Sequence, residues 1–584
     1  MTLLTTCGLQ SCSTSDSDEP IKKEGIVTVD VVLNVSAHQK TANEPNGADT
    51  RMPASSDVNQ FDVTQTSGKF RGVQELRLYP MASEEPVSPD YIGNLTRQGD
   101  TYNYLSTHQV ELSIGTSSFL CYGRAIPFTE NNEVAKFKNG FFNAHYDEEN
   151  PLNSYFDPEP IYVPDNKAQA IATYLTNIAT AGHWNQVTDE NETLSELRDL
   201  FKKFVNLNNT GEYSSFAGSS RNIKAMVSKL YQDIAKLNYG TGSEGATLQR
   251  TILSAITTGV TFDTNNHEVT NLGTTMDDYP THLPDGAAVI QWNKTTSQFE
   301  PILNQTAFND INSLNRFVYP AELYYFKHSS IKTSASSEKE HYNLSTWSGE
   351  SGVLHYYEND NAEVTTNTLS VAIKEPLDYA VGCLKTYIKA TSSTLKDANE
   401  DLTLQDVTLD AGTFPLTGIL IGGQTRQGYN FEPQKIGDQY DEYIIYDPTL
   451  QDESVCLGAV VSQYSSPLFT LALQTQEKKP VKLVLEFLNN SKDFVSENGI
   501  IYKGTKFYLV ASINVPATPA EDFTKRVFTK DYITEVHLDI NNLTHAYNAL
   551  PSLDSDNLHI FNTVQAGIQE WKAESTTSHS TYNW

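Results

Sequence analysis

The sequence is poor in cysteine, in basic residues and in long hydrophobic runs. Its 584 residues include five cysteines, which form no CxxC pair and no Cys/His cluster with zinc-ligand spacing. Lys and Arg number 41 against 72 Asp and Glu, so the net charge is −31. Nucleic acid and anionic lipid surfaces are bound through basic patches, and this balance argues against both as partners. No segment approaches the length of about 20 apolar residues that a transmembrane helix needs.

The sequence also lacks a recognisable catalytic constellation. The 13 histidines form no HExxH or HxH pair. The glycine-bearing segment Gly418–Gly423 does not have the order GxGxxG, and no helical pattern follows it. The acidic segment Glu358–Asn361 has no EF-hand register, which favours a solvated hairpin tip over a calcium loop. We therefore expect no enzyme activity and no catalytic, cofactor or metal site.

The residues that are abundant favour exposed β-sheet. Hydrophobic residues make up 38% of the chain and aromatics 10%, with 31 Tyr and 25 Phe. Such a chain can bury a core, and its length calls for two or three domains. Three cysteines, Cys121, Cys383 and Cys456, lie far apart in the sequence, so we expect them to be small buried hydrophobes.

Short alternating segments separated by turn residues predict a mainly β protein made of β-sandwiches. A helical pattern interrupts them between about residues 165 and 256, and we expect it to be an insertion in the N-terminal domain. The charged stretch 329–351 is the best break between domains. The predicted organisation is a tether over residues 1–24, an N-terminal domain over 25–345 and a C-terminal domain over 346–584.

The two ends of the chain carry similar strand-like segments. Alternating apolar residues mark the first, at Val27, Val29, Val31, Leu33 and Val35. The second has its apolar residues at Leu558, Ile560, Val564, Ala566 and Ile568, with Asn562 breaking the pattern. Period-2 alternation predicts a strand with one buried face. Either both strands complete ordinary sheets, or the last strand is a spare part that can replace the first.

Two features near the N-terminus bear on this choice. The segment Leu9–Cys12 is similar to the lipobox of a bacterial lipoprotein, although no basic region precedes it and its apolar stretch is short. The acidic run after Cys12 is typical of a flexible tether. A polar stretch, roughly residues 37–69, follows the first strand and contains a single arginine, Arg51.

Several segments of the chain resemble the Bacteroidales fimbrillin family, the lipoprotein-derived subunits of type V pili. The resemblance is carried by residues 70–73, 414–424, 429–431, 506–510, 526–534 and 546–553, together with the lipobox-like Cys12. It implies two tandem transthyretin-like (Greek-key) β-sandwich domains. It also implies lipidation at Cys12 and cleavage after Arg51 by a trypsin-like protease. The strand Val27–Val35 would then be lost, and the groove would be filled by the C-terminal strand of a neighbouring subunit, Leu558–Ile568, which belongs to a donor-strand extension of about residues 558–584.

The function that the resemblance implies is that of a structural subunit of a cell-surface fimbria, assembled by donor-strand exchange and serving adhesion. Its partners would be other fimbrillin subunits, the processing protease and, for the precursor, the outer membrane. No cofactor is expected. One alternative is a lipid-anchored glycan-binding protein, which would need a surface platform of Trp or Tyr. The other is a tip or anchor pilin, which would lack the donor strand or keep the first strand.

Overall fold

A computed structural model of the chain describes the following residues, and the fold is that of these residues alone: 26–34, 73–82, 85–86, 95–97, 103–106, 110–113, 116, 118–125, 142–160, 165–182, 184, 192–206, 220–277, 290–301, 316–321, 323–330, 370–373, 377–396, 406–410, 412–448, 455–517 and 521–570. The chain is mainly β, as the sequence predicts. The predicted tether, the predicted boundary near residue 345 and the segment Glu358–Asn361 lie outside the described residues.

The chain folds into two compact units, each assembled from separate stretches of sequence. The first comprises Met1–Val35, Leu76–Cys121 and Lys327–Glu375. The second comprises Ser36–Glu75, Tyr122–Phe326 and Pro376–Trp584. Both units are therefore discontinuous in sequence.

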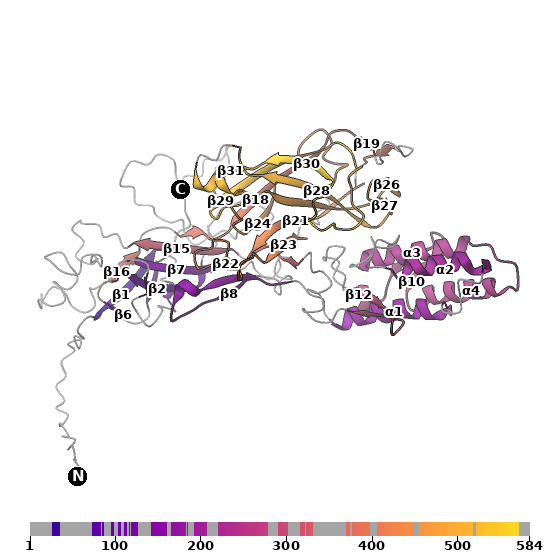
Figure 1. The fold of residues 1–584 in the computed structure, drawn as a ribbon, viewed down its shortest axis with the longest axis horizontal. Helices are drawn as coiled ribbons and strands as arrows, with labels where there is room; N and C mark the ends of the chain where they lie inside the picture. Colours follow the sequence, from indigo (N-terminus) through magenta and orange to yellow (C-terminus); the bar gives the residue numbers. More distant parts are fainter. Residues whose placement is uncertain are drawn as a thin grey trace, which may run out of the picture. The chain divides into compact units, whose positions relative to one another are not determined.

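Strand β1 (Ile26–Asn34) lies in the middle of a sheet in the first unit. It pairs in parallel with β16 (Ser370–Ile373), and on its other side it is antiparallel to β5 (Asn103–Ser106) and to β6 (Val110–Ser113). Strand β4 (Leu95–Arg97) extends this sheet beyond β5. Figure 1 shows β1 beside β16 and β6.

A further sheet has five strands in an order that brings distant segments of the chain together. The order is β17 (Asp378–Tyr379), β15 (Tyr324–Ser330), β7 (Ser118–Ala125), β2 (Val73–Ala82) and β3 (Glu85–Pro86). Strand β7 is buried from Phe119 to Tyr122. Apolar residues alternate with polar ones in the sequence near residues 72–81 and again in short runs near 110–126, and these stretches contain β2 and, in the second case, β6 and β7.

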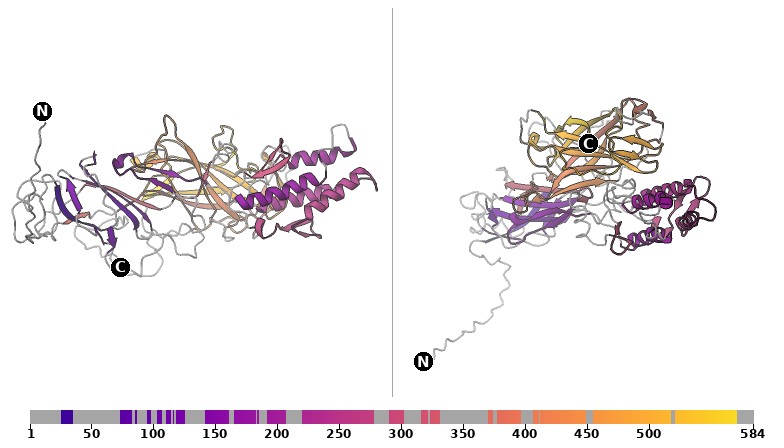
Figure 2. Two further views of the ribbon diagram at one scale, coloured as in Figure 1. Left: turned by 90° about the horizontal axis from the view of Figure 1, so that it is seen from below. Right: turned by 45° about the vertical axis from the view of Figure 1, so that its right-hand side comes forward.

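Helices occupy the part of the second unit where the sequence predicts them. The long ones are α1 (Asp165–Ala181), α2 (Ser195–Phe204), α3 (Ser220–Lys236) and α4 (Glu244–Thr257), and a single turn, α5 (Thr274–Asp277), follows. Helix α4 begins after Ser243, whose hydroxyl accepts a hydrogen bond from the Ala246 N–H at 3.2 Å. In Figures 1 and 2 the long helices run together as a bundle. None of the helices that the structure describes has both the length and the hydrophobicity to cross a membrane.

The helices share a hydrophobic core with the six-stranded sheet of the C-terminal part, whose strands are given in the next paragraph. Their buried residues, among them Leu175, Leu230 and Ile252, belong to one hydrophobic cluster with Tyr508 and Val510 of that sheet. The apolar stripes of the helices are thus buried together with strands of the sheet formed by residues 416–565, a contact that sequence periodicity cannot reveal. That the helices are an insertion in an N-terminal domain over 25–345 stays a prediction.

Two larger sheets form the C-terminal part of the second unit. The six-stranded sheet has the order β14 (Phe317–Val318), β23 (Glu442–Asp447), β21 (Leu416–Thr425), β25 (Val481–Leu488), β28 (Lys506–Asn514) and β30 (Ile560–Gln565). The four-stranded sheet has the order β24 (Leu468–Ala472), β18 (Gly382–Ala390), β29 (Tyr532–Ile540) and β31 (Gly567–Glu570). Most residues of β18, β21, β25 and β28 are buried, as in the interior of a layered β structure.

Smaller elements complete the second unit. A three-stranded sheet consists of β22 (Gln427–Gly428), β9 (Tyr155–Pro158) and β8 (Phe142–His145). The two-stranded ones are β10 (Thr261–Asp263) with β11 (Glu268–Asn271), β12 (Ile290–Asn293) with β13 (Gln298–Pro301), β19 (Thr394–Lys396) with β20 (Asp406–Thr408), and β26 (Phe494–Ser496) with β27 (Gly499–Ile501).

The three internal cysteines are buried, as their positions in the sequence predict. Cys121, Cys383 and Cys456 are free thiols with at most 1% of their surface exposed. Burial raises the pKa of Cys121 to about 12 and also raises that of Cys383. Because only the thiolate is a good nucleophile, both side chains are chemically inert at neutral pH.

Candidate functional site

Strand β1 has backbone partners along both of its edges. Residues Asp30–Leu33 are in register with β16 on one side. On the other side, residues 26–29 pair with β6 and residues 32–34 pair with β5. Each pairing is regular within itself, and the register changes by two residues between the β6 pairing and the β5 pairing, since Val29 is opposite Val110 and Val32 is opposite Leu105. Removal of β1 would therefore leave two rows of unpaired N–H and C=O groups facing one strand-wide gap.

The predicted C-terminal strand lies at the edges of the chain's own sheets. Its first part is β30, which pairs in parallel with β28 as the last strand of the six-stranded sheet. Its second part is β31, which pairs with β29 as the last strand of the four-stranded sheet. Between them, Ala566 is 6% exposed. Each part has one strand neighbour, so this segment is held less tightly than an internal strand.

The face pattern of this segment differs from the single apolar face that its sequence predicts. Val510 is in register with Ile560, but the next residue, Ala511, is in register with Asn562. Phe561 is therefore an extra residue, a β-bulge. Because side chains alternate along β28, the bulge places Ile560 and Val564 on opposite faces of the sheet. Both side chains remain only partly buried.

The other predicted site residues lie at the two ends of the chain. Val27, Val29, Val31 and Leu33 lie within β1, and the structure describes the backbone of this strand but not its side chains. Val35, the lipidation candidate Cys12 and the cleavage candidate Arg51 lie outside the described residues. Leu558 precedes β30 and is half-buried, and Ile568 lies in β31.

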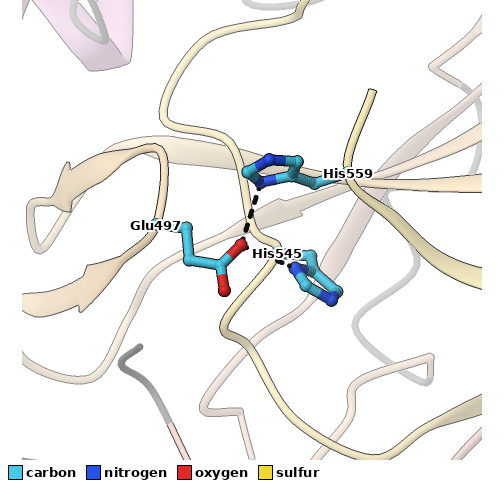
Figure 3. A group of neighbouring side chains, drawn as sticks. All are labelled: Glu497, His545 and His559. Atoms are coloured by element: carbon cyan, nitrogen blue, oxygen red, sulfur yellow. Dashed lines mark hydrogen bonds and ion pairs between the residues drawn. The ribbon is translucent and has the colours of Figure 1, made fainter. Parts of the chain in front are cut away.

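A cluster of Glu497, His545 and His559 lies next to the start of β30, and Figure 3 shows its three side chains converging. The Nδ1 atoms of His545 and His559 each lie 3.0 Å from Oε2 of Glu497. The ring centroids of the two histidines are 5.6 Å apart, and the ring planes are inclined by 63°. The side chains are 23% exposed for Glu497, 35% for His545 and 42% for His559. Two imidazoles and one carboxylate therefore face one another where solvent can reach them.

Hydrogen bonds that do not involve the Glu497 carboxylate hold the segment that carries this residue. The segment forms the turn between β26 and β27, and Gly499, which follows the turn, has a φ of +116°, a conformation that glycine adopts readily. The Glu497 N–H donates to the Thr544 carbonyl at 2.9 Å. The Ser496 hydroxyl donates to the Ala546 carbonyl at 2.6 Å. These bonds fix Glu497 beside the segment that carries His545.

Tyr547 holds the third member of the cluster. The Tyr547 hydroxyl accepts a hydrogen bond from the backbone N–H of His559 at 2.7 Å. Its own backbone exchanges two 2.9 Å hydrogen bonds with Tyr508 of β28. Burial raises the pKa of Tyr547, and the charge of Glu497 adds to the rise, so the hydroxyl stays protonated at neutral pH. The start of β30 is thus docked onto the C-terminal sheet through a tyrosine.

Sequence motifs do not reveal this cluster. Metal sites are recognised in a sequence by short ligand spacings, whereas Glu497 and His545 are 48 residues apart, and a further intervening loop separates His545 from His559. The fold alone brings the three together. The only sequence signal is that two of the 13 histidines lie in the segment just before the predicted C-terminal strand.

The surface features that a glycan-binding protein would need are weak in the described residues. A polar cavity of about 310 Å³ is lined by Glu432, Pro433, Tyr440, Gln476, Glu477 and Arg526. The Arg526 guanidinium is already engaged by Glu432 at 2.8 Å and by Glu477 at 3.1 Å. Of the five tryptophans the structure describes two, and Trp184 is 3% exposed while Trp292 packs against the helical core. Neither forms an exposed aromatic platform.

Comparison with known proteins gives no family assignment. No protein-family model matches the chain, and no curated protein matches it. Three solved structures show partial similarity. A "putative adhesin" from Bacteroides ovatus is 10% identical, with 87% of this chain and 88% of that chain covered and a TM-score of 0.24. A "putative cell adhesion protein" from Bacteroides eggerthii is 8% identical, with 93% and 96% covered and a TM-score of 0.25.

The third is a "putative cell adhesion protein" from Bacteroides uniformis, 10% identical, with a TM-score of 0.17 over 35% of this chain. The match spans 56% of that protein's length. At such identities and TM-scores, a function for this chain has to rest on its own residues.

Proposed function

We propose that the chain is a stalk-type structural subunit of a cell-surface fimbria that serves adhesion and is assembled by donor-strand exchange. In this proposal, the subunit consists of two tandem transthyretin-like domains. The removable strand is β1, and the donor is the C-terminal segment Leu558–Ile568 of a neighbouring subunit. Its partners are other subunits of the same or a related kind.

The observation that carries the proposal is the position of β1. It is a nine-residue strand paired on both sides, and it is the first strand that the structure describes. Its loss opens a gap with backbone donors and acceptors along both walls. A single strand of similar length satisfies both walls at once, which is the geometry of strand addition between chains.

An irregular position in its own sheet favours release of the C-terminal segment. In the sheet it carries a bulge at Phe561, and its apolar residues are divided between two faces. Within each of its separate pairings β1 has no register shift, and in a groove of that kind residues of one parity face one side. Four medium-sized apolar side chains, Leu558, Ile560, Val564 and Ile568, are only partly buried at the edge, and at about 2 kcal/mol each they would contribute roughly 8 kcal/mol of gross burial. The exchanged state thus buries more apolar surface than the edge position does.

Export and maturation are part of the proposal. We expect the precursor to be an outer-membrane lipoprotein anchored through Cys12, with a trypsin-like protease cutting after Arg51. For the anchor, Cys12→Ala should abolish labelling by a fatty-acid probe, because no other residue of the lipobox-like segment offers a thiol. Cys7→Ala is the matched control and should be labelled normally. Normal labelling of Cys12→Ala would refute the anchor.

For maturation, an arginine-specific protease should cut the native chain after Arg51 before it cuts after Arg77. Arg77 lies half-buried within β2, and a paired strand resists proteolysis, whereas an exposed polar loop is a preferred site of nicking. Sequencing of the first new N-terminus should read from Met52. The variant Arg51→Gln should remain uncut there and should not assemble. Assembly of uncut Arg51→Gln at the wild-type rate would contradict strand removal.

A further inference from the structure

We propose that Glu497, His545 and His559 form a site for a divalent transition-metal ion of the Zn²⁺ type, and that the ion fastens the start of β30 to its own domain.

The donor set selects the class of ion. Two imidazole nitrogens with one carboxylate suit Zn²⁺ and its first-row neighbours, whereas Ca²⁺ and Mg²⁺ favour sets of oxygen ligands. Three protein ligands also leave a fourth tetrahedral position open for water. A tetrahedral ion with ligand distances of about 2.0–2.1 Å holds its ligand atoms about 3.3 Å apart. Both nitrogens lie 3.0 Å from the Glu497 oxygen, so a small outward movement admits the ion.

The state of His559 is a second observation that points to a ligand. Its ring is 42% exposed, yet its Nδ1 atom is buried and has no hydrogen-bond partner, although Glu497 Oε2 is 3.0 Å away. A proton on this nitrogen would be an unsatisfied donor, and a lone pair would face the carboxylate oxygen. Either state costs free energy. A cation between the two atoms removes both problems. By contrast, the Nδ1 atom of His545 is hydrogen-bonded to Glu497.

Because the site lies beside the first residue of β30, a bound ion would hold this strand to its own domain. His559 is the residue before Ile560, the first residue of β30. Glu497 and His545 lie on segments that are hydrogen-bonded to each other. A bound ion therefore links an edge strand with one strand neighbour to a fixed part of the domain. This consequence rests on the proposed function, in which β30 must detach before assembly.

Isothermal titration of the full, unassembled chain with Zn²⁺ tests the site. We expect one Zn²⁺ bound per chain, and no comparable binding of Mg²⁺ or Ca²⁺. The variants His559→Gln, His545→Gln and Glu497→Gln should each weaken this binding by at least about tenfold, because even residues that only support a ligand typically contribute about 10- to 100-fold. The matched control is His537→Gln, since His537 also pairs with a carboxylate, Glu535 at 2.9 Å, but without a second histidine.

Hydrogen exchange of the β30 amides tests the fastening. Zn²⁺ should slow exchange across Ile560–Gln565 in the wild-type chain and in His537→Gln, but not in His559→Gln. Circular dichroism of the variants verifies that each is folded. Wild-type affinity in the three cluster variants, or no binding by the wild-type chain, would overturn the metal site. Zn²⁺ binding with unchanged β30 exchange would overturn the fastening. Both measurements use the unassembled chain, so their failure is distinct from a failure of donor-strand assembly.

Discussion

Lys506→Met should destabilise the six-stranded sheet by about 3–5 kcal/mol, because it leaves a buried carboxylate without its counter-charge. Lys506 Nζ lies 3.0 Å from Glu486 Oε1, and the two side chains are 2% and 0% exposed. Three hydroxyls also donate to this carboxylate, from Thr417 at 2.7 Å, Tyr446 at 2.8 Å and Tyr508 at 3.1 Å. Both oxygens of the carboxylate therefore have partners, so the pair is stable only as a complete set.

Native-state hydrogen exchange of the β25 and β28 amides measures this effect locally. At about 1.4 kcal/mol per factor of ten, a loss of about 3–5 kcal/mol should accelerate exchange by roughly two to three and a half orders of magnitude. The control is Lys482→Met on β25, whose ammonium makes a single long hydrogen bond, 3.4 Å, to Ser512. We expect it to cost less than about 0.5 kcal/mol.

The double variant Glu486→Gln/Lys506→Met separates charge from shape. The Gln oxygen still accepts hydrogen bonds from the surrounding hydroxyls, and no buried charge remains. We therefore expect the double variant to be more stable than Lys506→Met alone. Exchange in Lys506→Met that is no faster than in Lys482→Met would show that the buried pair has no such role.

Sequence patterns predicted which segments of this chain form strands and helices better than they predicted which segments pack against one another. The helical pattern between about residues 165 and 256 coincides with α1 to α4. Along Val481–Leu488 apolar residues alternate with Lys482 and Glu486, a strand pattern, and this segment is β25. The same alternation assigns Glu486 to a polar, solvated face, but the residue is fully buried. The cause is that Lys506 of β28 and three hydroxyls from neighbouring strands satisfy it, and these are contacts between distant parts of the chain. Alternation reports which residues share a face, not what covers that face.

The same limit applies to the candidate site. Period-2 alternation predicts strands at both ends of the chain, and the structure contains them. The bulge at Phe561 was not predicted, because it follows from the register against β28 and leaves in the sequence only the irregular Asn562. The Glu497–His545–His559 cluster forms because the turn between β26 and β27, the loop that carries His545 and the residue just before β30 lie close together in the fold. No short spacing of residues in the sequence indicates this proximity.

A disulfide between β28 and β30 should abolish assembly completely, since a donor strand that cannot leave its own sheet cannot enter another subunit. The pair to replace is Ser512 and Thr563, which are direct register partners. Neighbouring strands lie about 4.8 Å apart, within the Cα separations that a disulfide spans. Both changes to cysteine nearly conserve side-chain size. Cys121, Cys383 and Cys456 are buried, and in the proposed maturation Cys7 and Cys12 are removed with the segment that precedes the cut at Arg51.

The most direct test of donor-strand assembly is therefore the polymerisation of cleaved Ser512→Cys/Thr563→Cys under oxidising and reducing conditions, with each single variant as a control. The proposal predicts that the oxidised double variant stays monomeric, that a reductant restores wild-type polymerisation, and that the single variants polymerise under both conditions. Polymerisation of the double variant at the wild-type rate with its disulfide closed would contradict the proposal, because β30 would then still be paired with β28 of its own chain.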